Sequence, residues 1–111
     1  MPLLELATEA EFQKLVVEYA HQMGWKVHHT RPARTDKGWR TPIQGDPGFP
    51  DLVLVRGDYV NGRVVFAELK SQKGRISSEQ QGWLNALYAT CSVEVYEWRP
   101  SDWPTIQEVL R

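Results

Sequence analysis

The sequence has 111 residues, a formal net charge of −1 and a pI of about 6.3, with 41% hydrophobic and 24% charged residues. This composition is typical of a folded globular chain rather than a disordered one, and the length predicts a single domain spanning residues 1–111 with a modest core. The near-zero charge excludes a uniformly basic surface, so any contact with nucleic acid must come from local basic clusters.

Signals for secretion or membrane insertion are not found in the sequence. The N-terminal stretch MPLLELATEAE lacks a basic flank and a long apolar segment, and no apolar run reaches membrane-spanning length. The single cysteine, Cys91, cannot form an internal disulfide, and its apolar neighbours predict a buried thiol in a reducing compartment. We therefore expect a soluble, cytoplasmic protein with no membrane partner.

A helix, a short strand and a long loop are expected first along the chain. A capping box formed by Thr8 and Glu11 starts the helix, and apolar residues at helical spacing extend it over about residues 9–23. Residues 25–30 are typical of a short strand, whereas residues 31–48 show no periodicity and contain several glycines and prolines. A loop of that length in a compact domain is usually functional.

A β-hairpin and three further elements follow. Residues 51–56 are a continuous apolar run typical of a buried strand, and Asn61-Gly62 predicts a hairpin turn before a second strand at 63–70. The remaining elements are a helix from Ser77, a strand at 92–98 and a short helix that begins near Ser101 or Asp102. The expected order is α-β-β-β-α-β-α.

Two carboxylates and a lysine occupy the outer ends of the hairpin strands. Asp51 opens the first strand; Glu68 and Lys70 close the second and share a face, because strand residues two apart point the same way. Antiparallel pairing would bring these ends together, and two adjacent carboxylates repel each other unless a cation lies between them. The alternative interpretation is ordinary strand-end charge, with Lys70 as a salt-bridge partner.

A hard divalent cation suits this arrangement. Mg²⁺ binds through one or two carboxylates together with water and phosphate oxygens, and the backbone carbonyl of Leu69 could add a ligand. Lys70 would then lie beside the metal, where it can position or deprotonate an attacking water and offset charge on the phosphate. This is the equipment for phosphodiester hydrolysis, and the agreement of Pro50-Asp51, the E-x-K tripeptide and the hairpin favours it over the structural alternative.

Pro50-Asp51 followed by Glu68-Leu69-Lys70 resembles the signature of the PD-(D/E)xK nuclease superfamily, and the order of elements is similar to its core. The resemblance implies an α/β fold of the restriction-endonuclease-like type, with a mixed central sheet flanked by helices. More narrowly, the chain resembles the VRR-NUC family, including stand-alone phage and bacterial nucleases. The stretches that carry this likeness lie in order along nearly the whole chain: TEAEFQKLV, GW-x-V-x-H-T, G-x-PDLVLVR, VVFAELKS, GRIS-x-EQ-x-x-WL and VYEWRP.

The resemblance implies a DNA endonuclease that depends on Mg²⁺ or Mn²⁺, with Asp51 and Glu68 as metal ligands and Lys70 beside the attacking water. It also implies a glutamate on the first helix. At about 100° per residue, Glu9 lies roughly 50° from the centre of the apolar stripe and Glu11 roughly 110°. We choose Glu9, which also stands four residues before Gln13, although its alternative role is to favour the positive helix N-terminus.

A glutamine and a histidine are implied by the same resemblance. Gln80 matches the family's glutamine on the second helix, while its alternative role is a capping box with Ser77. His29 matches the family's strand histidine; we interpret it as a hydrogen-bonded structural residue and keep it among the candidates for DNA contact. The basic loop and the turn after the catalytic strand supply the other DNA-binding candidates, which are Arg31, Arg34, Lys37, Trp39, Arg40, Lys73 and Arg75.

The sequence thus predicts an endonuclease, with branched DNA such as four-way junctions as the favoured substrate. Stand-alone members resemble Holliday-junction resolvases in size, and symmetric cutting needs two sites, so a homodimer in a bacterial or phage-infected cell is expected. Trp83 and Trp98 are placed in the core or at the dimer surface. The alternatives are a sequence-specific or nicking restriction-type endonuclease, and a non-catalytic DNA-binding module that keeps the fold.

Overall fold

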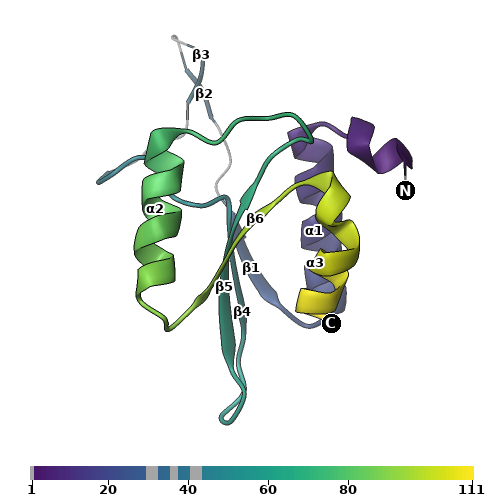
Figure 1. Ribbon diagram of the computed structural model, residues 1–111, viewed down its shortest axis with the longest axis vertical. Coiled ribbons are helices and arrows are strands. Elements are labelled where there is room, and N and C mark those ends of the chain that lie inside the picture. Colours follow the sequence, from purple (N-terminus) through teal and green to yellow (C-terminus); the bar gives the residue numbers. More distant parts are fainter. Residues whose placement is uncertain (1, 30–32, 36–37, 41–43) are drawn as a thin grey trace.

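The computed structural model describes residues 2–29, 33–35, 38–40 and 44–111. Its centre is a four-stranded mixed sheet in the order β1-β4-β5-β6, in which only β5 and β6 are parallel. Helices cover both faces: α2 lies on one side, and α1 and α3 lie together on the other (Figure 1). The strand bounds are β1 Lys26–His29, β4 Leu52–Arg56, β5 Arg63–Leu69 and β6 Glu94–Trp98, and the helix bounds are α1 Glu9–Gln22, α2 Ser78–Ala89 and α3 Trp103–Leu110. The predicted α/β class with a mixed sheet is confirmed.

Short elements extend this core. Two 3-10 helices, η1 (Pro2–Leu6) and η2 (Pro100–Asp102), precede α1 and α3. Within the segment predicted as one long loop, β2 (Ala33–Thr35) and β3 (Gly38–Arg40) form a separate two-stranded antiparallel sheet. Three-residue strands are too short to show a periodicity, so the expectation of an unstructured 31–48 segment was wrong where β2 and β3 lie. No helix among the described residues is long and apolar enough to span a membrane.

The first helix forms as its sequence pattern predicts. The Thr8 hydroxyl accepts a hydrogen bond from the Glu11 N–H at 3.1 Å, and the Glu11 carboxylate accepts one from the Thr8 N–H at 2.9 Å. This capping box satisfies two N–H groups that the helix itself leaves unpaired. Phe12, Val16 and Ala20 are fully buried, so the apolar stripe of α1 faces the sheet. The capping box therefore fixes where the helix starts and how Glu9 enters it.

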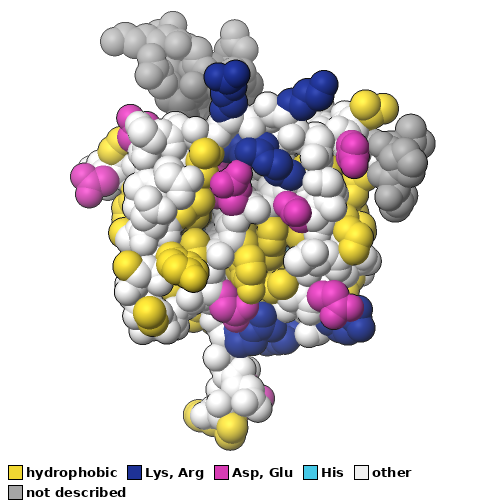
Figure 2. All heavy atoms as spheres, in the orientation of Figure 1, with side chains coloured by type: hydrophobic (Ala, Val, Ile, Leu, Met, Phe, Trp, Pro, Cys, Tyr) yellow, Lys and Arg dark blue, Asp and Glu magenta, His cyan; other side chains and the backbone are white. Residues whose placement is uncertain are grey.

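The predicted β4–β5 hairpin is confirmed, and it pairs Leu52 with Ala67 and Arg56 with Arg63. Its turn is shaped by the Asp58 carboxylate, which accepts hydrogen bonds from the N–H groups of Val60 and Asn61 at 2.8 and 3.2 Å. The tip projects away from the body of the molecule and ends in exposed hydrophobic side chains (Figure 2). This turn fixes the register that aligns the opposite end of the hairpin.

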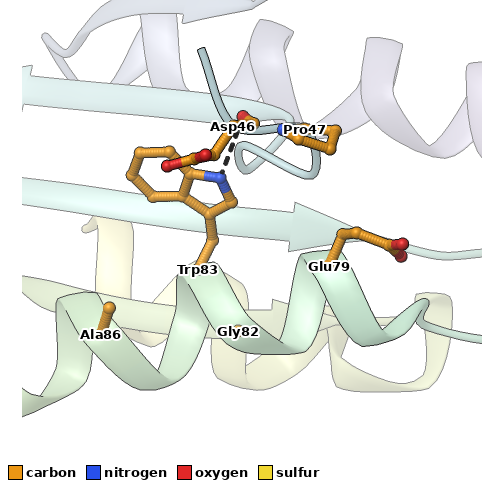
Figure 3. Close-up of a pocket in the computed structure, with 6 residues that line it drawn as sticks. All are labelled: Asp46, Pro47, Glu79, Gly82, Trp83 and Ala86. Atoms are coloured by element: carbon orange, nitrogen blue, oxygen red, sulfur yellow. Dashed lines mark hydrogen bonds between the residues drawn. The ribbon is translucent and has the colours of Figure 1, made fainter.

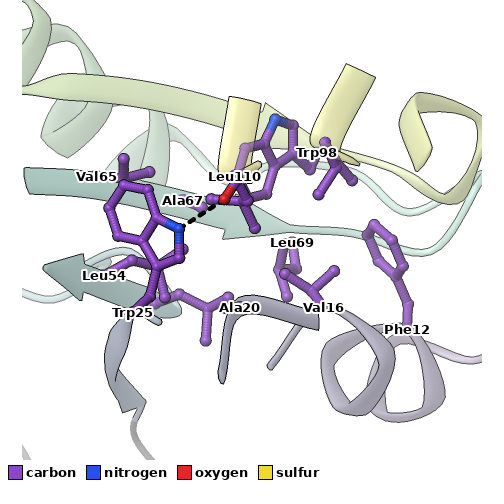
Figure 4. Packing of buried hydrophobic residues seen from close by; sticks show 12 residues of the cluster. Phe12, Val16, Ala20, Trp25, Leu54, Val65, Ala67, Leu69, Trp98 and Leu110 are labelled. Carbon is purple, nitrogen blue, oxygen red and sulfur yellow. Dashed lines mark hydrogen bonds between the residues drawn. The ribbon is translucent and has the colours of Figure 1, made fainter. Parts of the chain in front are cut away.

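The C-terminal helix closes the core through contacts with the sheet and α1. Leu110 is fully buried within the hydrophobic cluster, and its carbonyl accepts a hydrogen bond from the Trp25 indole N–H at 2.9 Å (Figure 4). The Arg56 guanidinium donates to the same carbonyl at 3.1 Å and to Met23 at 3.0 Å, and it lies 4.5 Å from the Trp25 ring centre. These bonds supply partners for helix-end carbonyls that would otherwise lack them.

The burial of Cys91 differs from the sequence-based expectation, and the two tryptophans differ from each other. Cys91 is exposed rather than buried, because it lies in the turn after α2 with a positive φ of 58°, outside both neighbouring elements. Its apolar sequence neighbours belong to the helix and to the next strand, so local composition was a poor guide. Trp98 is buried in the core, with 2% of its surface exposed, whereas Trp83 is only partly buried and packs against Phe49 in the segment before β4.

Leu110→Ala should lower the free energy of unfolding by about 2–5 kcal/mol, because it removes a fully buried side chain from a packed core. Urea denaturation followed by circular dichroism measures this change. Thr105→Ala, at an exposed position of the same helix, is the control and should change stability by less than about 0.5 kcal/mol. Equal effects of the two substitutions would show that α3 does not seal the core.

Candidate active site

The register of the hairpin brings Asp51 opposite Glu68. Leu52 pairs with Ala67, so the residue before β4 faces the residue after Ala67 on β5. Asp51 then makes its own link across the pair, because its Oδ2 accepts a hydrogen bond from the Leu69 N–H at 2.8 Å. Antiparallel pairing therefore joins two carboxylates that are separated by a whole hairpin in the sequence.

Glu68 is a fully buried carboxyl group whose two oxygens have different surroundings. Oε1 accepts a hydrogen bond from the Gln80 side-chain amide at 3.1 Å and lies 3.9 Å from the Lys70 ammonium nitrogen. Oε2 is buried and has no hydrogen-bond partner among the described residues. Buried polar atoms are rarely left unsatisfied, so this oxygen calls for a ligand that is not part of the chain.

Lys70 directly follows the last residue of β5. Its N–H donates to the Trp98 carbonyl at 3.0 Å, which extends the pairing with β6. Its side chain is almost entirely buried, and Leu69 between the two charged residues is fully buried in the hydrophobic core. Because side chains alternate along a strand, Glu68 and Lys70 lie on one face of the sheet, while Leu69 between them packs into the core on the other face.

The structure separates the two glutamates at the start of α1. The pKa of Glu9 is raised, first by burial, with Lys70 lowering it and Asp51 raising it, so its carboxyl group lies within electrostatic reach of the hairpin end. Glu11 is fully exposed, and the Thr8 capping box lowers its pKa. Glu9 is thus the helix acid that faces the candidate site, while Glu11 is used by the helix cap.

Gln80 fills both of the roles that the sequence left open. Its carbonyl oxygen accepts a hydrogen bond from the Ser77 N–H at 2.8 Å, and the Ser77 hydroxyl accepts one from the Gln80 N–H at 3.1 Å. Its amide nitrogen is then oriented to donate to Glu68. One side chain therefore caps α2 and holds the buried carboxyl group, so the first turn of α2 is tied to the end of β5.

His29 lies at the edge of this region. Its strand position pairs with Leu52, next to Asp51, and its Nδ1 is 3.3 Å from the Gln13 side-chain amide nitrogen. Gln13 stands one turn after Glu9 on α1. His29 is exposed and hydrogen-bonded at the border of the site, and it remains a candidate for DNA contact.

The segment before Asp51 packs closely on α2, and sequence reasoning missed this contact. Gly48 has φ +97°, and a Cβ there would lie 2.5 Å from the Glu79 carbonyl carbon, so only glycine fits against the helix backbone. Phe49 packs edge-to-face on Phe66, and the Trp83 indole donates to the Asp46 carbonyl at 3.3 Å (Figure 3). The glycine two positions before Pro50 was the signal available in the sequence.

The turn after Lys70 is held by Arg99, which sequence reasoning also missed as a structural residue. The guanidinium of Arg99 donates to the Ser71 carbonyl at 2.9 Å and the Gly74 carbonyl at 2.6 Å, and it forms an ion pair with Glu97 at 2.9 Å. Because these bonds join β6 to the turn, the chain leaves Lys70 along a fixed path.

The remaining basic candidates fall into two groups. Lys73 is exposed within this turn and Arg75 is exposed just after it, and basic side chains gather at this end of the molecule in Figure 2. Arg31 and Lys37 lie outside the described residues. Arg34, Trp39 and Arg40 belong to β2 and β3, which the structure describes as backbone, so their contact with DNA remains a prediction.

The donor set fits a hard divalent cation. Burial is the largest cause that raises the pKa of Glu68 to about 9; the neighbouring Asp51 and Glu9 carboxylates add to it, while Lys70 opposes it. A bound cation would reverse this balance by favouring the ionised carboxylates. Among the described residues no three His, Cys, Asp or Glu side chains form a metal cage. Two carboxylates plus a carbonyl is instead the sparse, water-completed set that suits Mg²⁺.

The α/β core, with its acidic hairpin end and adjacent lysine, defines a nuclease-type domain. Comparison with models of known protein families matches residues 9–99 to the VRR-NUC domain, so the chain belongs to the VRR-NUC family. Membership implies a nuclease that acts on DNA. Searches of curated proteins and of solved structures found no match.

Glu68 should make the metal-free protein less stable as the pH rises. Its pKa is 4.5 in a model peptide and about 9 in the fold, so its stabilising contribution is complete below pH 4.5 and is lost as the pH rises toward 9. Glu68→Gln, a neutral isostere, should escape this loss and exceed the parent in stability at high pH. Urea denaturation with EDTA at about pH 5, 7 and 9 tests this. A stability difference that stays constant with pH would contradict it.

The two functions of Gln80 should separate by mutation. Gln80→Glu keeps an oxygen for the Ser77 N–H but places a second carboxylate beside Glu68, so we expect a folded helix and a large loss of activity. Ser77→Ala removes only the cap and should cost about 0.5–2 kcal/mol of stability with activity retained. Denaturation and DNA-cleavage assays on both variants measure this. Full cleavage activity of Gln80→Glu would show that Gln80 acts only as a helix cap and is not needed at the candidate site.

Proposed function

We propose that this protein is an endonuclease that hydrolyses DNA phosphodiester bonds with the help of Mg²⁺ or Mn²⁺. The observation that carries the proposal is the buried, unpartnered Oε2 of Glu68, located where Asp51, Lys70 and Glu9 converge. A buried carboxyl group with one oxygen lacking a hydrogen-bond partner lowers stability, and a purely structural salt bridge does not explain why it is kept. Binding of a cation and a phosphate at this oxygen explains it.

The residues of the chain divide the work as follows. Asp51, Glu68 and the Leu69 carbonyl would hold the ion, which when bound supplies Lewis-acid stabilisation of charge on the phosphate. Gln80 fixes the orientation of the Glu68 carboxyl group through its amide. Lys70 directs its ammonium N–H donors to the attacking water and to the negative charge that develops in the transition state. Glu9 adds a third carboxylate at the border of the site.

We further propose branched DNA as the substrate and a homodimer as the active form. One domain of this size contains one candidate site, whereas symmetric cutting of a four-way junction needs two sites related by a two-fold axis. A restriction-type or nicking endonuclease would use the same chemistry on plain duplex. A non-catalytic binding module is disfavoured, because DNA binding alone does not require a buried glutamate beside a second acid.

Asp51→Asn, Glu68→Gln and Lys70→Ala should each reduce cleavage by at least about 100-fold, since each removes a group that acts on the reacting phosphate. Glu9→Gln should also lower activity, while Glu11→Gln is the matched control, because glutamine preserves the capping box. Cleavage of supercoiled plasmid with Mg²⁺, Mn²⁺ or EDTA measures this. Parent-level cutting by all three hairpin variants would refute the site.

The preferred substrate is tested in the same assay with a labelled four-way junction beside the plasmid. Faster metal-dependent cutting of the junction supports branched DNA, and cutting of plain duplex at defined positions supports the restriction-type alternative. DNA binding without cutting under any metal condition would favour the non-catalytic module. Sedimentation of the protein with and without junction DNA measures whether it is a dimer.

A further inference from the structure

A groove of about 410 Å³ opens beside the candidate site, and among its lining residues only Lys73 has been considered above, as a candidate for DNA contact. One wall is the junction between η1 and α1, at Glu5, Leu6 and Ala7, and the other is the turn after β5, at Ser71, Gln72 and Lys73. Figure 1 shows the chain leaving β5 close to the start of α1 before it crosses to α2. We propose that this groove binds the nucleotide next to the scissile phosphate.

Both walls are direct continuations of the site. Ala7 precedes Glu9 by two residues, and Ser71 follows Lys70 immediately. A DNA strand whose phosphate lies against Lys70 must therefore extend either across this groove or away from it. The groove volume lies in the range of about 300–1,000 Å³ that small-ligand sites occupy, so it can hold one sugar with its base.

The two walls differ in chemistry. Lys73 is exposed and forms no ion pair within the described part of the chain, so its ammonium group is available for a phosphate oxygen. Leu6, on the facing wall, is 79% exposed, and Glu5 beside it carries a carboxylate that disfavours phosphate there. An apolar side chain next to an acceptor suits a base, which offers a flat face and exocyclic N–H donors. The phosphate is thereby assigned to the Lys73 side and the base to the Leu6 side.

The Lys73 wall is held rigid. Arg99 binds the carbonyls at both ends of the turn, Ser71 and Gly74, and the Gln72 side chain pairs reciprocally with Ser101 at 2.9 and 3.0 Å. A preorganised wall loses little freedom when DNA binds, so it can favour one position of the strand. Arg99 is on this assignment a positioning residue, which acts on DNA only through the turn.

This inference rests on the proposed function for the meaning of the site, but its test does not require cleavage. The probe is a fluorescein-labelled four-way junction, with one neutral methylphosphonate linkage moved through successive positions near the branch. Binding is followed by fluorescence anisotropy in EDTA over a series of KCl concentrations. Lys73→Gln should reduce the slope of log K against log salt by about 0.9, the value for one lost phosphate contact.

The position scan identifies the phosphate. One methylphosphonate should weaken binding of the parent by about three- to tenfold and leave Lys73→Gln unchanged, because the contact is already lost. Lys26→Gln is the matched control: Lys26 is also exposed but pairs with Val55 far along the sheet, and the slope and profile of this variant should equal those of the parent. For the base, an abasic site beside that phosphate should weaken the parent about threefold and leave Leu6→Ser unaffected.

The outcomes separate this proposal from the nuclease assignment. If the protein cuts DNA but Lys73→Gln shows the salt slope and methylphosphonate profile of the parent, the nuclease assignment stands and the groove proposal is wrong. Coupling between Lys73 and one phosphate in a protein that cuts nothing supports the groove and overturns the nuclease. Absence of DNA binding by the parent overturns both. If Lys73 is coupled to one phosphate but Leu6 is not coupled to the neighbouring base, the phosphate contact stands and the assignment of the base to the Leu6 side is wrong.

Discussion

The antiparallel register of β4 and β5 is the constraint on which the rest of the molecule depends. The pairing of Leu52 with Ala67 places Asp51 opposite Glu68, and the Asp58 turn at the far end of the hairpin fixes that pairing. A slip of one residue would turn every side chain of a strand to the other face. Such a slip would move Leu69 out of the hydrophobic core and Glu68 into it. The burial of the apolar side chains of β5 therefore also fixes the positions of its polar side chains. Core packing and the geometry of the candidate site therefore depend on the same contacts.

The buried carboxyl group of the candidate site lowers the stability of the fold, and contacts from the surrounding elements limit this loss. Glu68 is fully buried, and burial with acidic neighbours keeps its carboxyl group protonated in the absence of a cation. Gln80 supplies one hydrogen bond from the start of α2, and Gly48 allows the segment before Asp51 to press against the same turn. These contacts hold the carboxyl group in place without satisfying it completely. A bound ligand can therefore supply the interaction that this partly unsatisfied carboxyl group lacks in the fold alone.

Local signals were sufficient for most of the fold and part of the site. The capping boxes, the hairpin turn and strand alternation depend on residues close in sequence, so α1, α2, β4, β5 and the Asp51–Glu68–Lys70 grouping could be predicted. Contacts between distant segments could not. The Arg99 bonds to Ser71 and Gly74 and the fit of Gly48 on α2 leave no periodic pattern. Cys91 failed for the related reason that a turn overrides the apolar character of its neighbours.

The non-local contacts explain how so small a chain can hold a precise site. Elements from four parts of the sequence meet at one end of the sheet: the first turn of α1, the start of β4, the end of β5 and the first turn of α2. The start of β4, the end of β5 and the first turn of α2 are joined to one another by side-chain hydrogen bonds, and the first turn of α1 is fixed by its capping box. The same principle continues outward, because Arg99, the residue after β6, holds the turn that forms one wall of the neighbouring groove. On the proposed function, recognition of the strand and chemistry on its phosphate would therefore share one rigid frame, and a loss of that frame would impair both together.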